Sequence, residues 1–409
     1  MNCFINKLEL VCLSAVSGIL VAANGHAAEV SSFGVGSMES VDSTSTFPRF
    51  THAGLHYKML DVHAGLAVTA TYDENLNLVR SNKLSDFVFS LNPLLSIRMA
   101  DPAEAEPSKS LGLTYTPSIE RYLSQSSLDR MNQGVNFAAL LPMPRLRLGI
   151  TQSFTDNSSP VVDVQRRVNT QTYGTMLSSS YILSEKTSFE VNGNYNLSQN
   201  EGLVSTEEYL NQNWLNYVVT PKVSASLGLG LGLNKTDQGD DQRLMNLLLR
   251  SSYRLAEKVN VSISAGAEVR DYKTGGMAVD PVFSASARYR LSENSGISFT
   301  ASRETHASVA LVRQNYTSTG FNLDLYQKLF DRLSGTIGFG YDNLDYQSTA
   351  ASLAKTRSDS LISANLAATW SFTDSLRSTF AYTFRNNTST DDRLNVHESV
   401  ISISTSYLY

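Results

Sequence analysis

Hydrophobic residues recur at every second position along most of the chain. The clearest stretch is SASLGLGLGLN, residues 224–234, in which leucines alternate with glycines. A period of two is the side-chain period of a β-strand, so the leucines share one face and the small residues share the other. A soluble sandwich would expose the glycines, which weaken a strand. A membrane barrel instead turns the leucines to lipid and the small residues to a lumen.

The same alternation returns from residue 60 to the last residue. Apolar faces include those of Leu66–Tyr72, Phe87–Leu91, Val135–Leu141, Leu177–Leu183, Phe283–Tyr289, Ile337–Tyr341, Phe380–Phe384 and Ile401–Tyr409. Helical periodicity of useful length does not occur in the sequence. The pattern therefore predicts an all-β protein with about 18 strands, in the range of 16–18.

The connections between these strands alternate in length. Short ones include PMP from 142, SEKT from 184 and TPK from 220, whereas longer polar ones span 155–167, 235–242 and 348–357. Such sorting puts all tight turns at one end, which a soluble sandwich has no reason to do. We therefore predict a transmembrane, antiparallel up-and-down β-barrel with short periplasmic turns and longer extracellular loops.

The first residues have the anatomy of a secretory signal peptide. A short segment with one lysine precedes an apolar run of about 13 residues and a small-residue cleavage site that would end the signal at Ala27. The run is too short to span a membrane comfortably. We assign residues 1–27 to the signal peptide, 28–52 to a flexible periplasmic segment and 53–409 to the barrel. Export as a barrel places the protein in the outer membrane of a Gram-negative bacterium.

Composition agrees with this assignment. Charged residues make up 17% of the chain, below the roughly 25% of soluble domains, as a lipid-facing surface requires. The net charge of -5 gives no reason to expect a nucleic-acid partner. Cys3 and Cys12 both lie in the signal peptide, which excludes a disulfide framework and a cysteine-ligated metal from the mature chain.

The final strand ends on an aromatic residue. Tyr409 and Tyr407 share a face with Ile403 and Ile401, although Thr405 interrupts the apolar set. A terminal aromatic on an alternating last strand resembles the signal that the barrel assembly machinery reads, with Tyr in place of the commoner Phe. We expect Tyr409 and Tyr407 to form this assembly signal.

The stretch HAGLAVTATYDENLNLVRSNKLSDFVFSLNPLL, from His63, resembles the β-barrel porins associated with exopolysaccharide production. The matching positions are Tyr72, Asp73 and Asn75 at a strand end, Ser85 and Asp86 at the next strand start, and Pro93 inside that strand. The likeness continues through residues 111–150 and spans most of the mature chain. It implies an outer-membrane barrel and a role in polymer export, and it implies no catalytic residues.

Candidate functional residues lie on the face opposite the apolar sets, where basic residues outnumber acidic ones. The predicted pore-lining residues are Arg147, Arg250, Arg254, Arg270, Arg288, Arg290 and Glu268. Arginine-lined pores favour anions. The alternative is that these arginines simply pair with acids across strands.

The sequence contains only weak candidates for a catalytic or metal-binding site. His306 has Glu304 and Ser308 nearby in sequence, but we interpret it as a solvated histidine in an extracellular loop. His52, His56 and His63 have no ligand spacing on a recognisable element, and GLGLG lacks the lysine of a phosphate loop. We predict no enzyme activity, no cofactor and no metal.

The sequence therefore predicts a porin-like outer-membrane channel for passive diffusion of small, anionic solutes. One alternative is an outer-membrane component of exopolysaccharide export, and another is a structural barrel with an occluded lumen. The expected partners are outer-membrane lipid and lipopolysaccharide, the assembly machinery, and the polysaccharide or solute itself.

Overall fold

The computed structural model describes residues 54–100, 109–255, 258–273, 276–349 and 355–409. The predicted signal peptide and periplasmic segment lie outside these residues. The strands are β1 (Leu55–Tyr57), β2 (Leu60–Asp73), β3 (Asp86–Ala100), β4 (Ser110–Tyr115), β5 (Ser118–Tyr122), β6 (Arg130–Pro142), β7 (Leu146–Val161), β8 (Arg166–Ile182), β9 (Thr187–Asn200), β10 (Thr206–Thr220), β11 (Val223–Thr236), β12 (Gln242–Leu255), β13 (Val259–Tyr272), β14 (Gly276–Ser292), β15 (Ser295–Ala307), β16 (Gln314–Phe330), β17 (Leu333–Ser348), β18 (Lys355–Ser371), β19 (Leu376–Ser389) and β20 (Val396–Leu408). Two short 3-10 turns, η1 (Ser126–Leu128) and η2 (Asp392–Leu394), lie in connections.

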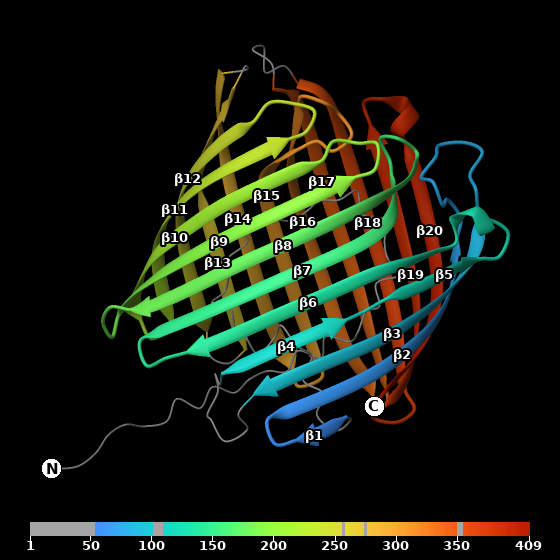
Figure 1. Ribbon diagram of the computed structural model, residues 1–409, viewed down its shortest axis with the longest axis horizontal. Helices are drawn as coiled ribbons and strands as arrows, with labels where there is room; N and C mark the ends of the chain where they lie inside the picture. The colour runs from blue at the N-terminus through green and yellow to red at the C-terminus, as the bar shows by residue number, and fades with distance from the viewer. Residues whose placement is uncertain (1–53, 101–108, 256–257, 274–275, 350–354) are drawn as a thin grey trace.

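These strands form one closed antiparallel barrel. Each strand from β6 to β20 pairs with the next along the chain, and β20 pairs with β2 from Gly65↔Leu408 to Asp73↔Val400. β4 and β5 form one interrupted strand, and β1 is a three-residue strand that pairs antiparallel with the start of β2. The ring therefore contains 18 strands. Figure 1 shows the strands following one another around the wall until β20 reaches β2 and β3. The predicted fold is confirmed.

The interruption between β4 and β5 has a local cause. Pro117 has no N–H group and cannot donate a ladder hydrogen bond. The chain resumes pairing at Ser118, and both halves pair with β3 and β6. Thr116 and Gly134 exchange backbone hydrogen bonds of 2.8 and 3.1 Å beside the break, which keeps the wall continuous.

The connections are sorted by end, but the longer ones are shorter than predicted. At one end of the barrel, which we call the short-turn end, the fully described connections contain two to four residues. At the other end, which we call the loop end, they contain four to twelve. The segment 155–167 was expected to be a loop. It instead extends β7 to Val161 and starts β8 at Arg166. Polar residues on both faces continue the strands there, because the backbone ladder does not depend on which face is apolar.

The two faces of the wall differ as the alternation requires. On β11, Leu227, Leu229 and Leu231 are 49%, 45% and 51% exposed. Gly228 and Gly230 point the other way, and neighbouring side chains cover them: a Cβ on Gly228 would lie 2.5 Å from the Trp214 ring. The glycines therefore leave space for neighbouring side chains on the inner surface.

Gly266 on β13 gives a test of this packing. A Cβ there would overlap the backbone carbonyl oxygen of Leu247, which cannot rotate away. We expect Gly266→Ala to destabilise the barrel by about 1–3 kcal/mol, measured as a lower denaturation midpoint and a smaller heat-modifiable fraction. Gly296→Ala is the control, because its nearest neighbour would be Tyr289 O at 3.6 Å. Equal midpoints for the two variants would contradict the close approach.

Candidate functional site

The inner surface is organised in rows that cross the strands. Residues paired directly across antiparallel strands share a face, and one such row contains Trp214, Gly228, Leu248, Gly266 and Val282. The three large side chains are buried and pack together, with a glycine between each pair. Bulky residues on alternate strands thus lie over the glycines of the strands between them.

The rows on either side are polar and mostly uncharged. Toward the loop end, the next row contains Asn192, Gln212, Gly230, Asn246, Glu268 and Asp280. Toward the short-turn end, the next row contains Ser188, Asn216, Ser226, Arg250, Ser264, Ser284 and Ser302. Amides and hydroxyls both donate and accept hydrogen bonds, so this wall suits contact with water and polar solutes.

Arg250 lies on this inner surface and is held by three groups. Its Nη2 lies 3.2 Å from Glu190 Oε2 and donates a 2.8 Å hydrogen bond to Asn216 Oδ1. The guanidinium carbon lies 4.2 Å from the centre of the Trp214 ring, in the geometry of a cation–π contact. A buried charge needs such compensation, so Arg250 is part of the packed wall.

Arg270 is likewise engaged, nearer the loop end. Its Nη2 and Nε donate to Glu268 Oε1 at 2.6 and 3.0 Å, and its Nη1 donates to Gln242 Oε1 at 3.0 Å. A further bond of 2.8 Å reaches Thr305 O on β15. The arginine and Glu268 are both buried, so this pair links β13 to β12 and β15.

The remaining predicted pore-lining arginines gather near the short-turn end. Arg147 follows the first residue of β7, and Arg254 precedes the last residue of β12. Arg288 shares a row with Arg254 through Asn260, and Arg290 is two residues further along the same face of β14. Arg254 and Arg288 are exposed. We call these four residues the basic rim.

The sequence placed five of these arginines on one wall with Glu268 as the close acid. The structure separates them into two kinds. Arg250 and Arg270 contact carboxylates, and Arg254, Arg288 and Arg290 belong to the rim. Glu190 was not expected to reach Arg250, because β9 and β12 are not neighbours and only the closed curvature brings their inner side chains together.

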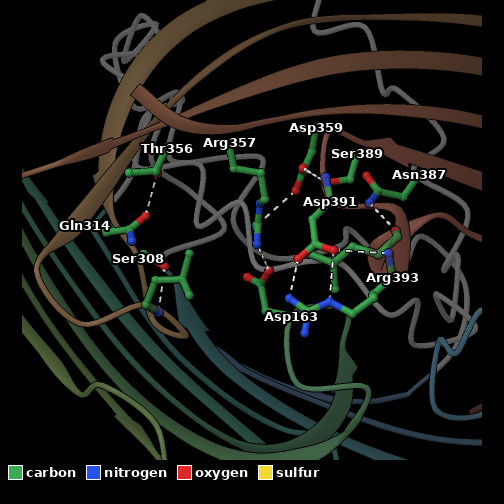
Figure 2. Close-up of polar contacts among 12 residues, drawn as sticks. Asp163, Ser308, Gln314, Thr356, Arg357, Asp359, Asn387, Ser389, Asp391 and Arg393 are labelled. Carbon is green, nitrogen blue, oxygen red and sulfur yellow. Dashed lines mark hydrogen bonds and ion pairs between the residues drawn. The ribbon is translucent and has the colours of Figure 1, made fainter. Parts of the chain in front are cut away.

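A second cluster closes part of the loop end. Asp163, in the connection between β7 and β8, lies 2.6 Å from Arg357 Nη1 on β18. Strand β18 lies on the far side of the ring from β7 and β8 (Figure 1), so this ion pair spans the barrel mouth. Figure 2 shows Arg357 between Asp163 and Asp359. Its Nη2 lies 3.0 Å from Asp359 Oδ2, and its guanidinium carbon lies 3.8 Å from the centre of the Tyr346 ring.

The same hairpin tip makes a second contact with the far wall. Gln165 Nε2 donates a 2.7 Å hydrogen bond to Arg393 O, in the connection between β19 and β20. Arg393 in turn donates to Asp391 through Nη2 at 2.7 Å and Nε at 3.0 Å (Figure 2). These bonds lower the pKa of Asp391 to about 2, so its carboxylate stays charged and holds Arg393 at ordinary pH.

A further set of contacts narrows the loop end on its other side. Val204 N donates a 2.8 Å hydrogen bond to Val309 O, joining the β9–β10 and β15–β16 connections. Gln242 and Asn315 exchange amide hydrogen bonds of 3.0 and 2.9 Å between β12 and β16. The loop end is therefore bridged at two places, and we call the Asp163–Arg357 bridge the mouth bridge.

Sequence reasoning did not identify Asp163, Arg357 or Asp359. Asp163 and Arg357 fell in segments taken as polar loops, and their partners are remote in sequence. The sequence did offer one indication, since residues 155–167 are polar on both faces. A hairpin that extends beyond the apolar belt is expected to be polar on both faces.

His306 was interpreted as a solvated loop residue, but it lies on β15. His306 is buried, with its Nε2 3.4 Å from Glu304 Oε2 and its ring against Tyr316. The Ser308 hydroxyl accepts a hydrogen bond from Leu311 N. Among the described residues, no group of three potential metal ligands gathers. No helix in the described part of the chain has the length and hydrophobicity to cross a membrane.

Comparison with protein-family models and with curated proteins gave no match. Several solved structures are similar. OpdK of Pseudomonas aeruginosa, crystallised with vanillate, is 10% identical, with a TM-score of 0.45 over 85% of this chain and 98% of that chain. OpdQ of the same organism is 11% identical, with a TM-score of 0.46 over 86% and 99%. OccAB4 of Acinetobacter baumannii is 10% identical, with a TM-score of 0.45 over 85% and 98%. At these values the likeness concerns the fold alone.

Proposed function

We propose that this protein is an outer-membrane channel for passive diffusion of small solutes, with no catalytic activity. The observation that carries the proposal is the sorting of the two faces of a closed wall. Exposed leucines and aromatic residues lie outside, whereas amides, hydroxyls and arginines lie inside. A closed barrel satisfies its backbone hydrogen bonds without water, so such a wall is stable in a lipid bilayer. An 18-stranded ring is wide enough for an aqueous passage.

The orientation follows from the connections. We assign the short-turn end to the periplasm and the loop end to the cell exterior, as outer-membrane barrels arrange them. The basic rim then faces the periplasm, and the mouth bridge faces the medium. Lipid and lipopolysaccharide would surround the belt.

A pair of tags flanking β10 tests this orientation. A tag between Glu201 and Gly202 should be reachable by antibody on intact cells, and one between Pro221 and Lys222 should be reachable only after the outer membrane is permeabilised. Both sites are exposed connections of the same strand, so each controls for the other. The opposite labelling pattern would reverse the assignment.

The basic rim supports a preference for anions. Its four arginines lie on the inward face at the short-turn end and outnumber Asp324, which shares the row of Arg288 through Ser298. An excess of like charges in a confined passage raises the local concentration of counter-ions. Arg250 and Arg270 contribute less, because carboxylates lie against them.

Reversal potentials in a KCl gradient test the preference. Arg254→Gln/Arg290→Gln should shift the purified protein toward cations. Lys186→Gln/Lys222→Gln should not, since it removes the same charge from exposed turns at the same end. Arg250 and Arg270 are left intact, because breaking a buried pair costs about 3–5 kcal/mol. An unchanged potential in the rim variant would contradict the anion preference.

The mouth bridge should limit conductance. Wild-type protein in planar bilayers should give discrete steps, and Asp163→Asn should give larger steps because the hairpin tip loses its ion pair with Arg357. Asp374→Asn, in an exposed turn at the opposite end, should match wild type. Silence from both wild type and Asp163→Asn would favour the structural barrel with an occluded lumen.

Polysaccharide export is the second candidate. The inner rows of amides and serines could follow a neutral, hydroxyl-rich polymer by exchanging hydrogen bonds with it. Weak ion selectivity together with block of the current by added oligosaccharide would favour this candidate.

Tyr409 and Tyr407 retain their proposed role as the assembly signal. Both side chains are exposed on the outer face. Tyr409 also exchanges backbone hydrogen bonds of 2.8 and 3.1 Å with Ala64 where the ring closes. The last residue is thus exposed to a receptor while its backbone completes the final seam.

A further inference from the structure

Strand β10 places two amides in the middle of the apolar outer belt. Its outward positions, counted from the short-turn end, are Tyr217, Leu215, Asn213, Asn211 and Tyr209. Exposed tyrosines mark the two borders of a membrane barrel. Asn213 lies four residues from each tyrosine, which is midway between those borders.

The surroundings of this amide pair are apolar. The residues directly beside Asn213 are Val191 on β9 and Leu229 on β11. Asn213 Nδ2 donates a 2.5 Å hydrogen bond to Asn211 Oδ1, and Asn211 Nδ2 donates to Asn192 O at 3.3 Å. Within the described part of the chain, Asn213 Oδ1 has no donor. Hydrocarbon offers none, so the amide pair is poorly suited to contact with lipid.

A groove adjoins the amide pair on the same outer surface. It has a volume of about 480 Å³, and its lining includes Gly193, Leu177, Tyr195, Tyr209 and Leu231. Gly193 forms its floor, where an added Cβ would meet only the Leu177 Cβ at 4.0 Å. Leu231 and Leu233 of β11 line the far side of this groove, and Leu227 and Leu229 of the same strand are exposed nearer the short-turn end. The groove is therefore shared by β8, β9, β10 and β11, and Asn211 of the amide pair is part of its lining.

We propose that this surface of β9, β10 and β11 binds a second copy of the same chain in the membrane. A two-fold axis along the membrane normal through β10 brings each amide pair against the other at the same depth. The same rotation places β9 of one copy opposite β11 of its partner. Such an interface is self-complementary, as a two-fold dimer requires.

The depth of Asn213 in the membrane favours a second copy of the chain as the binding partner. Lipid chains have no hydrogen-bonding group at the middle of the bilayer, so lipid leaves Asn213 Oδ1 without a donor. A partner must present a donor there, and a second copy does so through its own Asn213 and Asn211. Amide hydrogen bonds between transmembrane helices stabilise their association, and the same chemistry applies between two barrel walls. The proposal rests on the membrane location given above.

Cysteine cross-linking in intact outer membranes tests the dimer. Asn213→Cys should form a disulfide-linked species of twice the monomer mass on mild oxidation, because the residue lies next to its own copy at the axis. Phe380→Cys is the control, since it is an exposed outward position on β19, on the far side of the ring. Wild-type protein is a further control, because it shows any cross-link that forms through Cys3 or Cys12.

A second variant tests the dimer without a cross-link. Asn211→Leu/Asn213→Leu should remain heat-modifiable, because apolar residues suit the belt, and should migrate as a monomer in mild detergent where wild type migrates as a dimer. A dimer that persists in this variant, or a cross-link from Asn213→Cys to a different protein, would overturn the proposal. So would equal cross-linking at positions 213 and 380. If the protein is instead absent from the outer-membrane fraction, the proposed function fails first, and fractionation distinguishes the two failures.

Discussion

The structure depends on closure of the backbone ladder. In a bilayer no water is available to an unpaired N–H or C=O group, so a sheet is stable there only if its last strand pairs with its first. The pairing of β20 with β2, extended by the bonds between Ala64 and Tyr409, meets this requirement. Because the closed ladder uses only backbone groups, the side chains of the two faces can differ in polarity. Successive residues of a strand point to opposite faces.

On the inner face, glycines and large side chains alternate from strand to strand. Glycines on β11 and β13 make room for Trp214, Leu248 and Val282 on the strands between and beside them. The buried arginines then lie against carboxylates or the Trp214 ring, and the basic rim lies where the wall opens. Arg250 and Arg270 are therefore compensated within the wall, whereas Arg254 and Arg288 are exposed at the short-turn end.

The sequence predicted the elements that depend on neighbours in the chain. Alternation identified the strands, the strand number and the outward direction of Leu227–Leu233, because a closed wall imposes those patterns locally. It misjudged residues 155–167, where a strand continues beyond the apolar belt and has no alternation to mark it. It also missed Glu190 beside Arg250 and Asp163 beside Arg357, because these contacts arise from curvature and closure, which no local pattern encodes.

The mouth bridge also has a consequence for the order of folding. Asp163 and Arg357 are far apart in the chain, and their contact requires both walls of the ring to be in place. Contacts of long sequence separation cost more loop-closure entropy than contacts between neighbouring strands. The β7–β8 ladder needs no other strand, whereas contact of its tip with β18 needs the opposite wall. A barrel that still lacks β18 has no mouth bridge, so the bridge forms only when the far wall has been built.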